Sequence, residues 1–212
     1  MTRSAKIGRF FLSGMLLSLA MMALSCQSLR LADERETSGQ ATTSRSDHPR
    51  VVYVIRHAEK ERIPGAQDPP LTVEGKARAK ALATLFHDSP LDAIFATQFT
   101  RTQETVADLA ADQGLEITEI EAQETVGLVA LVRGMAGKKI MIAGHSNTVP
   151  NIVAGLGVDE KITIGHSGFG DLFVVTWKSD SAVVDRRRFG DPPLGNDKSA
   201  PSLPDDSAAG HH

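Results

Sequence analysis

The stretch "VVYVIRHAEKE", residues 51–61, decides the fold because its character changes abruptly in the middle. Its first five residues, 51–55, are all β-branched or aromatic, which is typical of a buried strand. Arg56 and His57 follow directly, and mixed charges come after them. In open α/β sheets, ligands bind beyond the carboxyl ends of the strands. We therefore expect Arg56 and His57 to lie at such an edge and to act on a ligand there.

Outward from this stretch, apolar runs in strand style alternate with segments of helical periodicity. Thr72 is a plausible N-cap of the first helix, and Gly114 is expected to stop the second. Strands are predicted over residues 51–55, 91–97, 115–120, 138–144, 171–177 and 182–189, and helices over residues 72–88, 99–113, 124–137 and 145–157. This alternation predicts an α/β fold, a three-layer α/β/α sandwich with a mostly parallel sheet, helices on both faces and an antiparallel pair possible at its end.

Three predicted strands end next to basic or imidazole side chains. Besides Arg56 and His57, Thr97 and Arg101 follow the strand that ends near Ala96, and His145 follows the strand that ends at Gly144. Three distant segments would thus bring two arginines and two histidines to one edge of the sheet. A helix that begins near His145, capped by Ser146 or Asn147, would add backbone N–H groups and the positive end of its dipole.

Such a set suits a phosphoryl group. Arginine offers a planar fork of N–H donors and a charge that does not titrate, which matches a phosphate dianion. Hydrogen bonds to charged groups contribute about 1.5 to 3 kcal/mol each, so several donors together would hold the anion firmly. A neutral imidazole can also attack phosphorus, and the unperturbed histidine pKa of about 6.5 leaves a neutral fraction at neutral pH.

Four ordered segments resemble the signatures of the histidine phosphatase superfamily, phosphoglycerate-mutase-like branch. They are "RHAEK", "LTVEGKARA", "TQFTRTQET" and "IAGHSN", and the resemblance covers residues 50–177, with a compact size similar to the small phosphohistidine-phosphatase type. It implies a phosphoglycerate-mutase-like fold and a phosphatase that needs no metal and no cofactor. It also implies that His57 is the phosphorylated nucleophile, that Arg56 and Arg101 grip the phosphate, and that His145 donates to the phosphoryl oxygens.

The same resemblance implies a glutamate that protonates the leaving group, in the segment between Arg101 and His145. Glu124 is the predicted donor because it should lie just past a strand end and at a helix start. The other candidates for this role are Glu116, Glu119 and Glu121. Two positions depart from the family pattern: Ala58 replaces a glycine, and Glu104 replaces a glutamine and would place a negative charge near the helix of Arg101.

The two ends of the chain are expected to lie outside the domain. Residues 1–25 have basic residues followed by an apolar run of about 15 residues, a secretory signal pattern that is too short for a permanent span. Cys26 resembles the acylated cysteine of bacterial lipoproteins; the alternative is an unmodified cysteine beside an ordinary cleavage site. Residues 26–49 then form a disordered tether, residues 50–189 the domain, and residues 190–212 a disordered tail. This predicts an exported bacterial protein, periplasmic or held on the outer membrane or cell surface by a lipid anchor.

The charge balance excludes nucleic acid as a partner. The net charge is −3, and removal of residues 1–25 takes away three basic and no acidic residues, which gives −6. The one basic run, residues 186–188, is expected to be solvated or ion-paired. The expected partner is a phosphorylated small molecule or phosphoprotein. The alternative function is a non-catalytic phosphate-binding or interaction module on the same scaffold.

Overall fold

The computed structural model describes residues 48–179 and 181–190, which form a six-stranded sheet with four helices. The predicted signal, Cys26 and the tether up to residue 47, like the predicted tail beyond residue 190, lie outside the described residues. Within the described part, no helix has the length and apolar character needed to cross a membrane. In chain order the elements are β1 (Val51–Arg56), α1 (Val73–Phe86), β2 (Ala93–Thr97), α2 (Thr100–Gln113), β3 (Ile117–Ile120), α3 (Thr125–Arg133), β4 (Lys139–Gly144), α4 (Val149–Gly155), β5 (Asp171–Lys178) and β6 (Ser181–Arg188).

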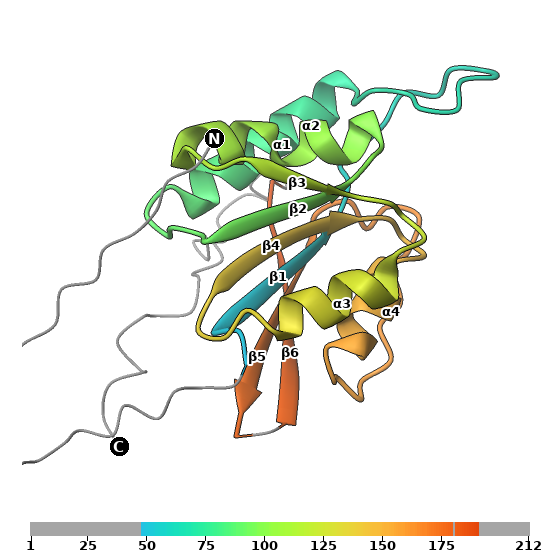
Figure 1. The fold of residues 1–212 in the computed structure, drawn as a ribbon. Coiled ribbons are helices and arrows are strands. Elements are labelled where there is room, and N and C mark those ends of the chain that lie inside the picture. The colour runs from blue at the N-terminus through green and yellow to red at the C-terminus, as the bar shows by residue number, and fades with distance from the viewer. Residues whose placement is uncertain (1–47, 180, 191–212) are drawn as a thin grey trace, which may run out of the picture. The chain divides into compact units, whose positions relative to one another are not determined.

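The strands lie in the order β3-β2-β4-β1-β5-β6. The four strands β3, β2, β4 and β1 are parallel, whereas β5 is antiparallel to both β1 and β6. α1 and α2 cover one face of the sheet, and α3 and α4 cover the other (Figure 1). The predicted α/β sandwich with a mostly parallel sheet and an antiparallel pair at one end is therefore confirmed.

The period of two in β1 explains the two cores. Tyr53 and Ile55 pack with α1 and α2 on one face, whereas Val52 and Val54 pack with α3 and α4 on the other. Because both faces are covered, all six residues of β1 are buried. Burial on both faces produces the continuous apolar run seen in the sequence and carries the chain straight to the sheet edge at Arg56.

The helix ends follow the sequence signals in two cases. Thr72 caps α1, and its hydroxyl oxygen accepts from the backbone N–H of Gly75 at 3.0 Å. Gly114 ends α2 in the left-handed conformation, with φ of 64°. Gly75 also allows α1 to approach the loop after β1 closely, because a Cβ there would collide with the backbone carbonyl of Glu59.

Candidate active site

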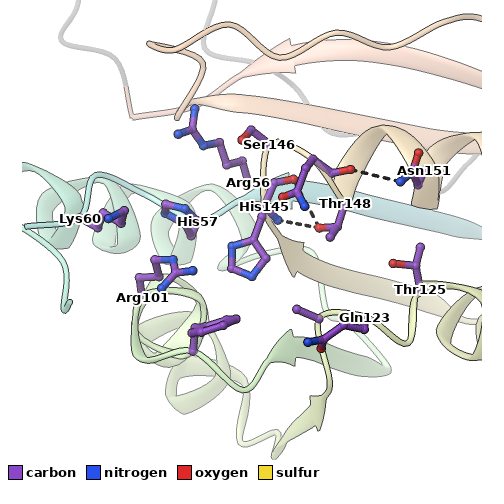
Figure 2. Close-up of a pocket in the computed structure, with 13 residues that line it drawn as sticks. Arg56, His57, Lys60, Arg101, Gln123, Thr125, His145, Ser146, Thr148 and Asn151 are labelled. Carbon is purple, nitrogen blue, oxygen red and sulfur yellow. Dashed lines mark hydrogen bonds between the residues drawn. The ribbon is translucent and has the colours of Figure 1, made fainter. Parts of the chain in front are cut away.

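All four predicted groups meet in one cavity at the carboxyl ends of the parallel strands (Figure 2). Arg56 is the last residue of β1 and His57 follows it, Arg101 lies in the first turn of α2 just beyond β2, and His145 directly follows β4. The neighbouring positions of β1, β4 and β2 in the sheet bring these ends together. The cavity has a volume of 570 Å³ and is lined by Arg56, His57, Lys60, Phe99, Arg101, Ala122, Gln123, Thr125, His145, Ser146, Asn147, Thr148 and Asn151.

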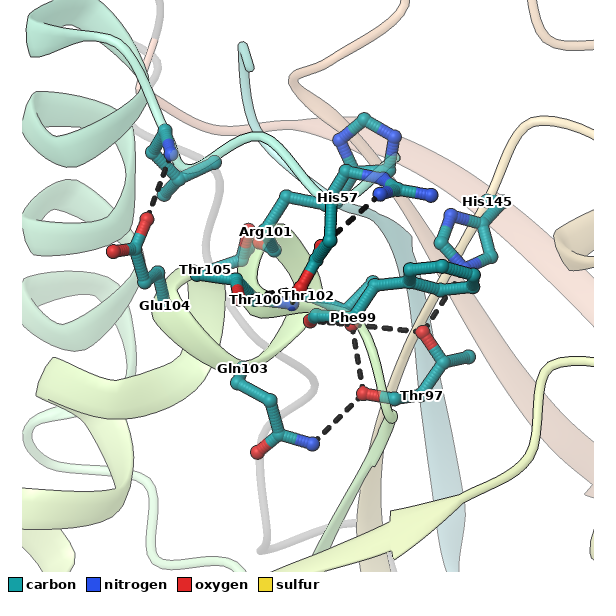
Figure 3. Close-up of polar contacts among 12 residues, drawn as sticks. His57, Thr97, Phe99, Thr100, Arg101, Thr102, Gln103, Glu104, Thr105 and His145 are labelled. Carbon is teal, nitrogen blue, oxygen red and sulfur yellow. Dashed lines mark hydrogen bonds and ion pairs between the residues drawn. The ribbon is translucent and has the colours of Figure 1, made fainter. Parts of the chain in front are cut away.

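His57 is buried and held by its neighbours. Its Nδ1–H donates to the carbonyl oxygen of Ala58 at 2.7 Å, since a carbonyl can only accept. The N–H of Ala58 in turn donates to the hydroxyl of Thr105 at 2.9 Å, and the Thr105 hydroxyl donates to the carbonyl of Arg101 at 2.6 Å (Figure 3). With Nδ1 protonated, the neutral ring keeps its lone pair on Nε2, the nitrogen suited to attack an electrophile.

The electrostatics of the site keep His57 neutral. Burial lowers its pKa to about 3, and the nearby His145, Arg101 and Arg56 add to this shift, although the bond to the Ala58 carbonyl opposes it. His57 is only 4% exposed. A neutral imidazole is the form that can act as a nucleophile, and His57 keeps this form over a wide pH range.

The two arginines are oriented by aromatic rings and carbonyl groups. The Arg56 guanidinium lies over the ring of Phe169 at 4.0 Å and donates to the carbonyl oxygens of Gly165 and His166, each at 3.2 Å. The Arg101 guanidinium lies over the ring of Phe99 at 4.2 Å.

In both arginines the Nε atom is buried and has no hydrogen-bond partner. Buried donors are almost always paired in proteins, so two unpaired ones beside His57 indicate a site built for an anion. After burial, the charges of Arg56 and Arg101 also lower the pKa values of His57 and His145, because they repel a proton on either ring.

His145 faces His57 across the cavity, with 5.4 Å between the ring centroids. Its Nε2 lies 2.9 Å from the hydroxyl of Thr97, at the end of β2. Burial, followed by repulsion from Arg101 and Arg56, lowers the pKa of His145 to about 4. In the absence of an anion, His145 is therefore neutral at physiological pH.

The expected helix start beside His145 was wrong. α4 begins only at Val149, its N-cap is Thr148 rather than Ser146 or Asn147, and the Thr148 side chain makes no capping bond within the helix. Instead, the Thr148 hydroxyl accepts from the backbone N–H of His145 at 2.9 Å. α4 has only seven residues, and its N-cap side chain binds the His145 backbone. We therefore assign no separate anion site to the start of α4.

The remaining lining side chains are uncharged apart from Lys60. Among the described residues that line the cavity there is no carboxylate. Glu124, the predicted proton donor, is the exposed N-cap of α3 and lies between two lining residues, Gln123 and Thr125, without lining the cavity itself. Of the other candidates, Glu121 accepts from the side chain of Gln98 at 2.7 Å, and Glu116 and Glu119 are exposed near β3. The choice of Glu124 stays a prediction.

Several residues that shape the site were not found from the sequence. Phe99 and Phe169 stack on the arginines, and Asp68, in the long loop after β1, accepts from the backbone N–H of Thr100 at 3.0 Å and lies 3.4 Å from Nη1 of Arg101. The side chain of Glu104 accepts from the N–H of Leu71 at 2.7 Å, so it anchors the same loop. Phe99 lies inside the segment "TQFTRTQET", but no local sequence pattern marks Phe169 or Asp68 as a partner of the arginines.

Comparisons with known proteins agree with this geometry. Residues 52–125 match the family model of the histidine phosphatase superfamily (branch 1). No curated protein matches the sequence. Among solved structures, the protein histidine phosphatase SixA complexed with tungstate is similar with a TM-score of 0.53 and 14% identity, over 65% of this chain and 96% of that chain. Phosphoserine phosphatase from Entamoeba histolytica, in complex with 3-phosphoglyceric acid, is similar with a TM-score of 0.52 and 16% identity, over 68% of this chain and 98% of that chain.

At these identities the likeness to solved structures concerns the fold, whereas the family model matches the sequence that carries the site. The matched residues contain Arg56, His57 and Arg101, and β4 brings His145 beside them. Over residues 52–125 the chain is therefore similar to the histidine phosphatase superfamily.

Proposed function

We propose that this protein is a phosphatase that hydrolyses phosphomonoesters, or phosphohistidine, through a covalent phosphohistidine on His57. The observation that carries the proposal is the pair of buried, unpartnered Nε–H donors of Arg56 and Arg101 beside a neutral histidine whose free lone pair is on Nε2. A phosphoryl group would satisfy both donors and present its phosphorus to that nitrogen.

In the first step, Nε2 of His57 attacks phosphorus in line with the leaving group. The N–P bond forms as the bond to the leaving atom breaks, and that atom takes up a proton. Arg56 and Arg101 neutralise charge on the non-bridging oxygens, which is where a phosphoryl transition state needs it. In the second step, water attacks the phosphohistidine, the N–P bond breaks, and inorganic phosphate leaves with His57 restored.

The decisive test compares His57→Ala with His87→Ala in the full-length chain, with an aryl phosphate as substrate. His87 lies on the surface beside Asp112, 3.0 Å away, and is a matched control. Loss of a nucleophile costs about 10⁴-fold or more in kcat. We expect that loss for His57→Ala, together with loss of an acid-labile, alkali-stable phosphoprotein in rapid-quench samples. Phosphate binding without turnover in the unaltered protein would instead support the alternative, a non-catalytic phosphate-binding module.

Within the same proposal, Glu124 protonates the leaving group. Its position beside Gln123 and Thr125 supports this role, because both of these neighbours line the cavity. General acid catalysis contributes about 10²- to 10⁴-fold, and it matters most for basic leaving groups. Glu124→Gln should therefore slow alkyl phosphates far more than p-nitrophenyl phosphate, with Glu119→Gln as the control. Equal effects on both substrates would remove Glu124 from this role.

Two substrate classes have support. The name of SixA supports testing a phosphohistidine protein, and the export and lipid anchoring proposed from residues 1–26 favour a phosphorylated small molecule or envelope component. Turnover of phosphorylated metabolites and of phosphohistidine peptides by the full-length chain would separate these substrates.

A further inference from the structure

Two buried hydroxyl groups connect His145 to the start of α2. Thr97 is the last residue of β2, and Thr102 lies in the first turn of α2. The Thr97 hydroxyl oxygen lies 2.9 Å from Nε2 of His145 and 2.8 Å from the hydroxyl oxygen of Thr102 (Figure 3). All three side chains are buried, so water does not compete for these bonds.

The hydrogen positions in this chain follow from its acceptors. The Thr102 hydroxyl lies 2.7 Å from the carbonyl oxygen of Phe99 and 2.9 Å from that of Thr97. A carbonyl oxygen cannot donate, so the single hydroxyl hydrogen of Thr102 points to these carbonyls. The Thr97 hydroxyl must then donate to Thr102, which leaves its own oxygen to accept the Nε2–H of His145.

The two histidines are consequently held in opposite tautomers. His57 has its proton on Nδ1, bonded to the Ala58 carbonyl, and presents a lone pair on Nε2. His145 has its proton on Nε2 and keeps the lone pair on Nδ1. No hydrogen bond joins this Nδ1 to any described residue. A lone pair repels a phosphoryl oxygen, so neutral His145 in this tautomer cannot donate to the phosphate.

We propose that Thr97 and Thr102 are positioning residues that hold His145 as the Nε2–H tautomer, so that it binds a phosphoryl oxygen through Nδ1 only after taking up a second proton. The inference rests on the proposed function, because that function identifies the bound anion as a phosphoryl group. Proton balance is simple: the phosphoryl O–H bond of a monoanion breaks and an Nδ1–H bond forms, or, with a dianion, the proton comes from solvent.

The charges around His145 make this uptake conditional on the anion. Arg56 and His57 face it from the end of β1 and Arg101 faces it from α2, and no carboxylate lines the cavity among the described residues. Burial and these positive charges keep His145 neutral when no anion is bound. A phosphate dianion brings two negative charges against them, and a nearby opposite charge favours the protonated ring. Binding and protonation of His145 are therefore coupled.

The first experiment measures proton uptake when inorganic phosphate binds to the full-length chain at pH 8, by titration calorimetry in buffers of different ionisation enthalpy. For the unaltered protein we expect uptake of about one proton per phosphate. In Thr97→Val the Nε2–H loses its acceptor and His145 can take the Nδ1–H form, which donates without a further proton. Uptake should then fall below about half a proton, and phosphate affinity about tenfold.

Thr97→Ser keeps the hydroxyl and should restore the uptake, whereas Thr84→Val, which alters an exposed threonine of α1, should leave it unchanged. A purely structural role of Thr97 would lower the melting temperature and leave the uptake as it was. Unchanged uptake in folded Thr97→Val would place the proton on His57 or on the phosphate itself, and would overturn the proposal.

A second measurement needs no variant of Thr97. In ¹⁵N-histidine-labelled protein without phosphate at pH 8, the His145 signals, identified by their loss in His145→Asn, should show the proton on Nε2. An Nδ1–H signal would overturn the proposal even if every threonine variant failed to fold. The results also separate failure of the proposed function from failure of this inference. An Nε2–H signal and normal proton uptake without turnover would count against hydrolysis alone. Turnover with an Nδ1–H signal would count against this inference alone.

Discussion

Two pairs of arginines in this protein differ in what lies beside them. Arg186 and Arg188, on β6, both bind the carboxylate of Asp171, at 2.6 and 3.0 Å, and Asp171 is only 1% exposed. Arg56 and Arg101, at the cavity, instead stack on phenylalanine rings and keep buried, unpartnered Nε atoms. The residue type is the same in both places. The close carboxylate on β5 makes the first pair structural, whereas the second pair, whose one ion pair among the described residues is the longer contact of Arg101 with Asp68 at 3.4 Å, is left able to bind an external anion.

Stacking on phenylalanine rings stabilises the two cavity arginines, which lack a close carboxylate of the kind that Asp171 provides. A guanidinium over an aromatic face gains about 0.5 to 2 kcal/mol, depending on how far it is desolvated. This attraction fixes the orientation of Arg56 and Arg101 without neutralising their charge. The one carboxylate near Arg101, that of Asp68, lies 3.4 Å away and is mainly engaged with Thr100. The cavity thus keeps a positive electrostatic potential, whereas the charges of the β6 arginines are partly neutralised by Asp171.

The sharpest test of this contrast is alanine substitution in each pair. Arg101→Ala removes charged hydrogen bonds worth about 1.5 to 3 kcal/mol each, so kcat/KM for an aryl phosphate should fall about 10³-fold, with a higher KM for substrate and a higher Ki for phosphate. Arg186→Ala should leave kcat/KM within about twofold, since the side chain is half exposed and lies outside the cavity lining. Similar losses in both variants would contradict the division into structural and anion-binding arginines.

A second test uses the histidines that each environment controls. The pKa of His57 is lowered to about 3 by burial and by the neighbouring positive charges, whereas a hydrogen bond to Asp112 raises the pKa of His87 on the surface. Between pH 6.5 and the folded pKa, the unfolded chain binds a proton at His57 that the folded chain does not. The free energy of unfolding should therefore fall as the pH falls through this window, by about 2 kcal/mol between pH 7 and pH 5 for this one group.

Urea denaturation of the unaltered protein and of His57→Asn at these two pH values measures that contribution. The variant should lose about 2 kcal/mol less on acidification. His87 has the opposite sign, because its stabilising contribution is present below pH 6.5 and is lost as the pH rises through its raised pKa. His87→Asn should therefore not reduce the acid sensitivity. An equally steep loss of stability in His57→Asn would show that the cavity charges do not control this histidine.

Much of this arrangement could be predicted from the sequence, because short segments of the chain carry the signals. The apolar runs before Arg56, Thr97 and His145 indicate buried strands, and parallel strands that end together place whatever follows them at one edge. Residues 186–188 were predicted to be solvated or ion-paired, and the structure shows ion pairs with Asp171 and Asp185. In each case the signal lies within a few residues of its consequence.

What escaped prediction depends on contacts between distant segments. The bond between Ala58 and Thr105 and the capping of α2 by Asp68 join residues more than thirty positions apart, and no periodicity or spacing marks such pairs. The predicted start of α4 was wrong because residues 146–148 form a turn, in which the Thr148 hydroxyl accepts from the backbone N–H of His145, and the helix begins only at Val149. The tautomer of His57 follows from its neighbour Ala58, whereas the tautomer proposed for His145 depends on Thr97, 48 positions away.

The smallest effect is expected from a substitution that adds a carboxylate to the cavity lining. Such a carboxylate would make the surroundings of Arg56 and Arg101 more like those of the β6 arginines. Asn147 is an exposed lining residue, and Asn147→Asp changes its charge with almost no change in shape. Near a partly solvated site, one charge is worth up to about 1 kcal/mol, so the Ki for phosphate should rise about fivefold at low ionic strength. Gln67→Glu, in the exposed loop after β1, is the matched control and should change the Ki less.

Added salt should shrink the effect of Asn147→Asp, because the charge acts through a solvated path. An unchanged Ki at low salt would mean that the two arginines bind phosphate by contact alone, and that the missing carboxylate matters only at hydrogen-bonding distance.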